Sequence, residues 1–319
     1  MVVPSDYIAA DLFCGAGGTS AGLLEAAAEL GLQIKLIAVN HWDVAIATHS
    51  ENHPFADHYC EAVENLDPRK VVPQGYLRLL VASPECRFHS NARGGRAIND
   101  QLRTSPWDIL RWMEALYIED VLIENVPEFR DWGPLDENGH KIKAKKGQIF
   151  RAYIRDMRAL GYHVDYRVLN AADYGDPTTR ERLFIIARRK HRVRWPEPTH
   201  TNRPEQMRFD GRTLQPWRTA REIIDWSIPG ESIYSRKRPL ADNTMRRIPA
   251  GLRKFSGLPF LLPDEGYFRG NTPRSVNQPL QTVTASRGEG HLVQPFLVQL
   301  NGTRDEQIDG SAMTPDRPL

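Results

Sequence analysis

The start of the chain follows an order of elements that restricts the fold more than any other segment. An apolar run over Tyr7–Phe13 breaks into the glycine-rich segment Cys14–Gly18. A helical pattern over Ala21–Leu30 follows and ends at Gly31, a residue type that commonly terminates helices. A second apolar run covers Leu36–Asn40. Strand, glycine turn, helix and strand form a βαβ unit, which predicts an α/β fold with a parallel sheet.

The glycine-rich segment Cys14–Gly18 stands between a strand and a helix, where ligands commonly bind. Glycine lets the backbone approach a ligand closely, and the unbonded amides of a first helical turn favour a carboxylate or a phosphate. A motif this short also occurs as a tight turn without any ligand. We therefore expect a site for a dinucleotide or a nucleoside-based methyl donor, with a plain turn as the alternative.

Two later strands predict reactive side chains at one edge of the sheet. The apolar run Leu77–Ala82 is stopped by Ser83-Pro84, so Cys86 follows the carboxyl end of a strand. The next predicted strand, Tyr117–Ile123, ends at Glu124. Open α/β sheets bind their ligands at this edge. A single cysteine is also commonly a small buried apolar residue, so the pattern alone leaves both interpretations open.

The second half of the chain changes character. Val164–Leu169 and Leu183–Ala187 predict two more strands, with Arg180 and Arg182 between them. Two arginines separated by one residue point the same way if they lie on a strand. Past Arg192, proline, arginine and short turns replace the alternation of strands and helices. The 319 residues are therefore expected to form a larger domain, residues 1–190, and a smaller, irregular, mostly β domain, residues 191–319.

Charge and cysteine usage narrow the class of protein. The net charge is only +2, but arginines gather between residues 180 and 221, a pattern typical of a surface that follows a phosphate backbone. A solvated charged surface is the alternative. No apolar run approaches the roughly 18 residues of a membrane span, and the first residues lack a signal-peptide pattern. The three cysteines are far apart and form no CxxC pair, so neither a disulfide framework nor a metal site is expected.

Several segments, in this order along the chain, resemble the motifs of the DNA cytosine-5 methyltransferases. They are Asp11–Gly18, Pro84-Glu85-Cys86 with Ser90, Glu124–Val126, and Leu169–Gly175 leading into Arg180-Glu181-Arg182. The resemblance covers roughly Ile8 to Arg189. The chain is similar above all to the phage and prophage branch of the family, which has Ser-Pro-Glu-Cys where most members have Pro-Pro-Cys. It implies a Rossmann-like class I methyltransferase sheet, a target-recognition domain at residues 191–319, and the cytoplasm of a bacterium or a phage-infected host.

The resemblance implies methyl transfer to C5 of a flipped cytosine. C5 is a poor nucleophile until a thiolate adds to C6, and Cys86 matches that nucleophile. Glu124 matches the carboxyl group that shares a proton with N3. Arg182 would hold the base oxygen O2, while Arg180 would hold the cysteine loop or a phosphate. Double-stranded DNA is the implied partner, because such a site reaches only a base that has left the stack. The implied DNA contacts are Arg87, Ser90, Arg93, Arg96, Arg192 and Arg194.

The implied cofactor is S-adenosyl-L-methionine. Phe13 and Trp42 match the residues on the two faces of adenine, and the glycines Gly15, Gly17 and Gly18 match the turn around the methionine portion. The other implied cofactor contacts are His41, Glu61 and Pro84.

Two departures from the family pattern leave alternatives open. His41 stands where a glutamate usually grips the ribose, and a less negative pocket would tolerate a modified donor such as carboxy-S-adenosylmethionine, with Arg87 beside the added carboxylate. The closing segment similar to Gln-Ile-Gly-Asn-Ala-Val-Pro does not occur. We therefore expect a chain that is truncated at its C-terminus, completed by another polypeptide, or inactive. A catalytically silent DNA-binding module and an RNA methyltransferase are the other functional alternatives.

Overall fold

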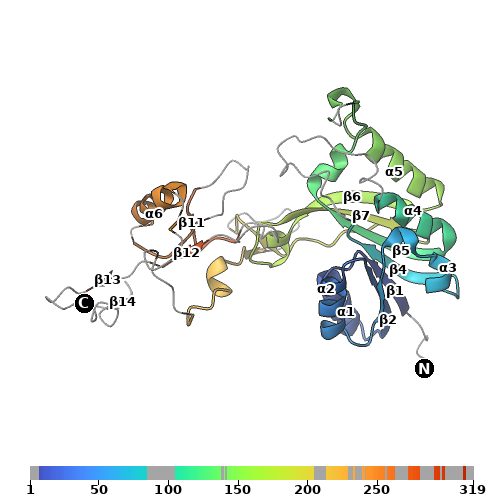
Figure 1. Cartoon of the computed structure of the whole chain (residues 1–319), viewed down its shortest axis with the longest axis horizontal. Helices are drawn as coiled ribbons and strands as arrows, with labels where there is room; N and C mark the ends of the chain where they lie inside the picture. The colour runs from blue at the N-terminus through green and yellow to red at the C-terminus, as the bar shows by residue number, and fades with distance from the viewer. Residues whose placement is uncertain are drawn as a thin grey trace. The chain divides into compact units, whose positions relative to one another are not determined.

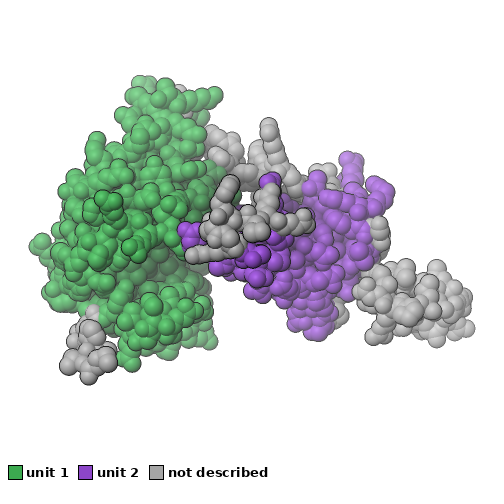
Figure 2. All heavy atoms as spheres, turned by 180° about the vertical axis from the view of Figure 1, so that it is seen from behind, with its two compact units in different colours: residues 1–169, 181–196 green, residues 170–180, 197–319 purple. Residues whose placement is uncertain are grey.

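The computed structural model describes two compact units, which Figure 2 shows in different colours. The first unit comprises residues 1–169 and 181–196, and the second comprises residues 170–180 and 197–319. The described residues are 7–84, 105–137, 140, 142–204, 213–228, 233, 239–240, 242–255, 257–262, 272–280, 291–294, 297–298 and 312–313. Five residues predicted for the site lie outside them: Cys86, Arg87, Ser90, Arg93 and Arg96.

A seven-stranded sheet forms the centre of the first unit (Figure 1), with the strand order β3-β2-β1-β4-β5-β7-β6. The strands are β1 (Tyr7–Leu12), β2 (Ile34–Asn40), β3 (Asp57–Cys60), β4 (Tyr76–Ala82), β5 (Tyr117–Asn125), β6 (His163–Asn170) and β7 (Glu181–Arg188). β1 to β5 pair in parallel, whereas β7 pairs antiparallel with β5. The α/β fold is confirmed, and the antiparallel strand makes the sheet mixed.

Helices cover both faces of this sheet (Figure 1). The α-helices are α1 (Gly18–Glu29), α2 (Asp43–Asn52), α3 (Pro68–Val71), α4 (Ser105–Ala115) and α5 (Gln148–Ala159). Short 3-10 helices cover Val63–Asn65, Pro127–Asp131 and Lys143–Lys145. The central strands are buried on both faces, as their nearly continuous apolar sequences predict. Trp112, Phe129 and Tyr153 are the largest fully buried side chains of the main core.

The strand register brings the carboxyl ends of the parallel strands to one edge. Leu12 lies opposite both Val39 and Ala82, and Ala82 lies opposite Ile123. Because β7 is antiparallel, its first residues lie at this same edge and its last residues lie at the other. We call the first the carboxyl edge and the second the amino edge of the sheet.

Where the structure describes it, the second unit is irregular and its strands are short. They are β8 (His200–Thr201), β9 (Gln215–Pro216), β10 (Phe260–Leu262), β11 (Arg274–Ser275), β12 (His291–Val293), β13 (Leu297–Val298) and β14 (Ala312–Met313). One longer helix, α6 (Asp242–Lys254), and the 3-10 helices Ala171–Tyr174 and Ala220–Glu222 accompany them. Phe260 is fully buried among apolar neighbours of this unit. The second unit is smaller than the first and contains small β-sheets.

The two units do not divide the chain at residue 190. Trp195 stays with the first unit, where its indole N–H donates to Asp165 at 2.7 Å. The segment 170–180 groups with the second unit, because the Asp173 carbonyl accepts from the Thr199 amide at 2.9 Å and its carboxylate accepts from Trp217 at 3.0 Å. Arg180 therefore precedes β7 and belongs to another unit than Arg182, so the two arginines do not share a strand.

Candidate active site

The carboxyl edge gathers most of the predicted site residues that the structure describes. Phe13, Trp42, Glu61 and Pro84 each follow the end of one parallel strand by one or two residues, and Glu124 is the penultimate residue of β5. This placement follows from the parallel register, since equivalent ends of parallel strands lie side by side. The sequence pattern predicted this edge for Cys86 and Glu124.

The glycine turn at this edge has an uncommon backbone conformation. Phe13, Gly15 and Gly17 have φ angles of 62°, 56° and 99°. A left-handed phenylalanine is strained, and such residues cluster where a ligand is held. A Cβ atom added at Gly15 or Gly18 would meet no atom of the described residues within 4 Å, so these residues leave space open beside the turn. Among the described residues no side chain caps α1, which leaves its first amides available to an anionic group.

Asp11 is the penultimate residue of β1, three residues before Cys14, and is fully buried. Its Oδ2 accepts from the Ser20 hydroxyl at 2.7 Å, whereas its Oδ1 has no hydrogen-bond partner among the described residues. Burial raises the pKa of this carboxyl to about 7, against the lowering effect of the Ser20 hydrogen bond. A negative charge buried on β1, three residues before Cys14, suits a cationic nucleoside derivative, which is the chemical character of S-adenosyl-L-methionine.

The side chains expected near adenine and ribose are accessible. Trp42 is 58% exposed at the start of α2, and its backbone N–H donates to Asn40 at 2.9 Å. His41 is also exposed. Glu61 Oε1 accepts from Asn65 Nδ2 at 2.8 Å and from the Ala62 amide at 3.0 Å, and these bonds lower the pKa of Glu61. Glu61 is therefore held as an ionised acceptor at the end of β3.

Glu124 and Arg182 form an ion pair at the carboxyl edge. Arg182 Nε lies 2.9 Å from Glu124 Oε1, and the two side chains are 18% and 25% exposed. Arg182 also donates from Nη1 to the Glu181 carbonyl at 2.7 Å. A charge-assisted bond of this length orients both groups. The sequence predicted both residues, but their pairing depends on the antiparallel register of β5 and β7.

Asn125 is a site residue for which no role was predicted. It is buried, and its Nδ2 donates to the Pro84 carbonyl at 3.2 Å. This bond ties the end of β5 to the chain two residues before Cys86. Asn125 stands within the motif Glu124–Val126, and its position next to the carboxylate was the only sequence signal for it.

The structure describes two cysteines, Cys14 and Cys60, and Cys14 lacks the surroundings of a nucleophile. Burial, followed by the negative charge of Asp11, raises the pKa of Cys14 to about 12, so this thiol stays protonated. Cys60 is exposed at the end of β3. A thiolate is the reactive form of cysteine, which makes Cys14 unsuitable as a nucleophile. Among the described side chains, no group of three or more histidines, cysteines or carboxylates could hold a metal ion.

Arg192 and Arg194 lie away from the carboxyl edge. Together with Arg188, Lys190 and His191 they line an open cavity of about 510 Å³, which we call the basic groove. Arg188 is opposite Asp120, whereas Phe184 is opposite Glu124, so β7 carries the groove about 13 Å along the sheet. The groove therefore adjoins the amino edge, and the structure does not bring it together with the Glu124–Arg182 pair.

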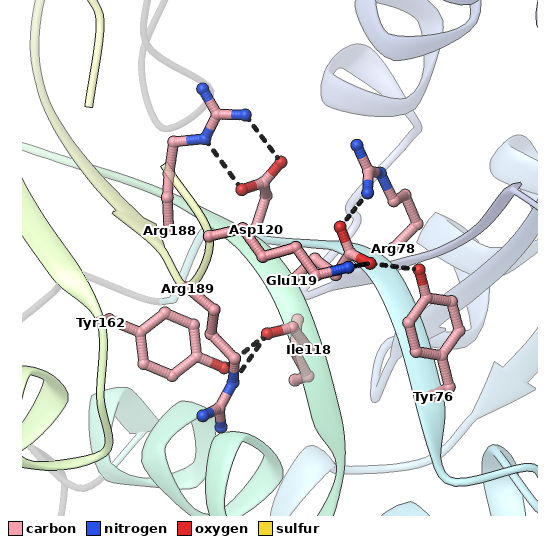
Figure 3. A network of polar contacts seen from close by, with 9 residues as sticks. Tyr76, Arg78, Ile118, Glu119, Asp120, Tyr162, Arg188 and Arg189 are labelled. Carbon is pink, nitrogen blue, oxygen red and sulfur yellow. Dashed lines mark hydrogen bonds and ion pairs between the residues drawn. The ribbon is translucent and has the colours of Figure 1, made fainter. Parts of the chain in front are cut away.

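Acidic residues of β5 neutralise two cations of the basic groove, and Figure 3 shows this network. Asp120 accepts from Arg188 at 2.9 and 3.2 Å. Glu119 accepts from Lys190 at 2.6 Å and from Tyr76 at 2.8 Å, and it also pairs with Arg78. These bonds join β4, β5 and the end of β7.

Comparisons with known proteins agree with this architecture. The family model described as C-5 cytosine-specific DNA methylase matches residues 7–249. The Type II methyltransferase M.AgeI of Thalassovita gelatinovora is 31% identical over 242 residues, which are 71% of this chain and 52% of the relative. The Type II methylase M.HgiDII of Herpetosiphon aurantiacus is 27% identical over 254 residues, 75% of this chain and 61% of the relative. The chain thus spans between half and two thirds of the length of these relatives.

A solved structure shows the same fold. The crystal structure of a mutant of Spodoptera frugiperda DNMT2 aligns with a TM-score of 0.50 and 19% identity, covering 70% of this chain and 61% of that chain. No helix in the described residues is long and apolar enough to cross a membrane.

Proposed function

The chain belongs to the C-5 cytosine-specific DNA methylase family, which uses S-adenosyl-L-methionine, and from this we propose that it methylates C5 of cytosine in double-stranded DNA. The observation that carries the proposal is the ion pair between Glu124 and Arg182 at the carboxyl edge. N3 and O2 are neighbouring atoms on one edge of cytosine. A carboxyl group and a guanidinium held side by side suit these two atoms.

The proposed roles follow from the chemistry of the base. The Cys86 thiolate adds to C6, while Glu124 shares a proton with N3 and Arg182 binds O2, so that charge on the ring is relieved. When bound, S-adenosyl-L-methionine supplies the methyl group that C5 attacks. Loss of the C5 proton to a base then releases the Cys86 sulfur from C6. Asn125 supports these steps by holding the Pro84 carbonyl, and thus the chain that leads to Cys86.

The methyl donor is proposed to bind between the glycine turn and the ends of β2 and β3. The accessible Trp42, the open space beside Gly15 and the unsatisfied oxygen of Asp11 support this placement. The proposed contacts are Phe13, Gly15, Gly17, Gly18, His41, Trp42, Glu61 and Pro84. A carboxylated donor remains the alternative, and it rests on the exposed His41 at the ribose position.

DNA recognition is proposed for residues 191–319, with contacts from Arg87, Ser90, Arg93, Arg96, Arg192 and Arg194. Arg180 is proposed to hold the cysteine loop or a phosphate. The arginine content of the second half of the chain supports this assignment. The segment Ser83–Cys86 supports a place in the phage and prophage branch. We place the activity in the cytoplasm of a bacterium or a phage-infected host, where DNA is the accessible substrate.

A duplex carrying 5-fluorocytosine tests the proposal, because fluorine at C5 cannot leave as a proton does and the covalent adduct accumulates. We expect an adduct with the wild-type chain and none with Cys86→Ala. Cys60→Ala is the matched control, since it removes an exposed thiol and should keep the adduct. Glu124→Gln should slow transfer by about 10²–10⁴-fold, the usual contribution of a positioned acid or base.

Two outcomes would contradict the proposal. Methyl transfer without any adduct would exclude Cys86 as the nucleophile. DNA binding with neither transfer nor adduct would favour the catalytically silent module.

A further inference from the structure

A chain of polar side chains runs behind the glycine turn through the interior of the first unit. Ser20 Oγ lies 2.7 Å from Asp11 Oδ2, His49 Nε2 lies 3.1 Å from Ser20 Oγ, and His58 Nε2 lies 2.9 Å from His49 Nδ1. The four residues come from β1, α1, α2 and β3. Asp11, Ser20 and His49 are fully buried, whereas His58 is half-buried. We call these four residues the relay.

The relay has a direction when Asp11 is ionised. The carboxylate can only accept, so the Ser20 hydroxyl donates to it, and the Ser20 oxygen then accepts from His49 Nε2–H. A neutral imidazole with its proton on Nε2 has a lone pair on Nδ1, which accepts from His58 Nε2–H. Burial, followed by the neighbouring His53 and His58, lowers the pKa of His49 to about 4 and keeps its ring neutral. All three bonds therefore point toward Asp11.

The surroundings of Asp11 make its charge sensitive to pH. The titratable groups that face it or the relay are Cys14 in the glycine turn, His49 on α2, His53 directly after α2, and His58 on β3. His53 lies against the glycine turn, with Nε2 3.4 Å from the Gly17 carbonyl, and its ring packs edge-on to His49 with the centroids 4.8 Å apart. The relay therefore connects, through the His53 ring, with the turn that is proposed to hold the methyl donor.

We propose that Ser20, His49 and His58 are positioning residues that maintain Asp11 as an anion near the glycine turn, so that ionisation of Asp11 strengthens binding of the positively charged sulfonium donor relative to its neutral thioether product. The inference rests on the proposed function and adds a specificity determinant to it. Donor and product share the adenosine and amino-acid portions, and the positive charge on sulfur distinguishes them. A buried anion favours the cation, because Coulomb interactions are strong where water is excluded.

The sign of the pH dependence follows from the carboxyl group. Burial raises the pKa of Asp11 to about 7, so below this pH the group is mostly neutral and above it mostly ionised. Donor affinity should therefore rise as the pH increases through 7, while product affinity should change little. We expect the ratio of the two dissociation constants to change about tenfold across this range, the effect of one partly screened charge.

Calorimetry on the whole chain, with S-adenosyl-L-methionine and S-adenosylhomocysteine as probes on both sides of pH 7, tests the inference without turnover. Donor binding should also release protons near neutral pH, which measurements in buffers of different ionisation enthalpy detect. Asp11→Asn should remove the pH dependence of the ratio. His49→Phe deletes both ring nitrogens of the relay and should move the inflection to higher pH, because the anion loses support. Ser20→Ala should act in the same direction and serves if His49→Phe does not fold.

His53→Phe is the matched control, because His53 touches the same turn and packs on His49 without belonging to the relay. It should leave the inflection where it is in the wild type. Equal pH dependence for donor and product, or an unchanged inflection in both His49→Phe and Ser20→Ala, would overturn the inference. Failure of both probes to bind at any pH would instead contradict the proposed cofactor site.

Discussion

Asp11 destabilises the fold as the pH rises, because its carboxyl group must lose its proton in a buried site. Its pKa is raised from 3.8 to about 7, so its contribution to stability is fully present below pH 3.8 and is lost as the pH rises through 7. His49 acts in the opposite direction. Its pKa is lowered from 6.5 to about 4, so its contribution is present above pH 6.5 and is lost as the pH falls through 4.

We predict that Asp11→Asn changes the pH profile of stability. Asparagine can still accept the Ser20 hydrogen bond but cannot ionise. The free energy of unfolding of the variant, relative to the wild type, should therefore increase between about pH 4 and pH 7, by on the order of 2–4 kcal/mol. Urea unfolding at several pH values measures this difference. The contribution of His49 to the free energy of unfolding cancels, because both proteins retain this residue. A difference that does not vary with pH would show that Asp11 titrates normally.

The glycine turn and α1 form one element in which two glycines have different roles. Gly17 has a φ of 99°, and a side chain there would begin 2.8 Å from the His53 ring. Gly22 lies inside α1, where an added methyl group meets no atom within 4 Å in the part of the chain that the structure describes. The first glycine is required by the backbone and by packing, whereas the second only weakens the helix.

We predict that Gly17→Ala and Gly22→Ala change stability in opposite directions. Gly17→Ala should lower the free energy of unfolding by about 1–3 kcal/mol, because alanine is strained at this φ and displaces His53. Gly22→Ala should raise it by about 0.5–1 kcal/mol through helix propensity. Denaturant unfolding of the two variants measures both effects. Equal tolerance of the two substitutions would contradict the conformation of the turn.

Two charged sites lie at opposite edges of the sheet in the first unit. The Glu124–Arg182 pair lies at the carboxyl edge, while the basic groove with Arg192 and Arg194 adjoins the amino edge. The arginine-rich sequence begins beside the proposed active site, but β7 leads it away along the sheet. If the groove contacts DNA, it contacts a part of the duplex other than the target base.

We predict that Arg192→Ser/Arg194→Ser weakens binding to long duplexes more than to short duplexes centred on the target. Removing two phosphate contacts should reduce the slope of log affinity against log salt by about 1.8. Fluorescence anisotropy with duplexes of two lengths measures both quantities. Arg151→Ser/Arg155→Ser removes the same charge from the exposed side of α5 and serves as the control. Loss of the same size for both duplex lengths would place the groove at the target, and no loss would indicate a solvated surface.

The elements of the first unit could be predicted from the sequence because their signals are local. Apolar runs, the glycine turn and the helix ends located the central strands and α1 to within a few residues. Parallel strands share an edge, so the place of Glu124 at the carboxyl edge also followed. The order of the short motifs along the chain was sufficient to indicate the family.

Tertiary structure alone decided which side chains meet. The Glu124–Arg182 bond depends on the antiparallel register of β7, and the relay joins His49 and His58 to Asp11 across four elements. Arg180 precedes β7 whereas Arg182 lies on it, and Arg192 adjoins the amino edge. Both placements likewise depend on where strands end and pair. These are non-local properties: residue type and periodicity report which face a residue occupies, whereas register and burial determine its partners, its charge and its pKa.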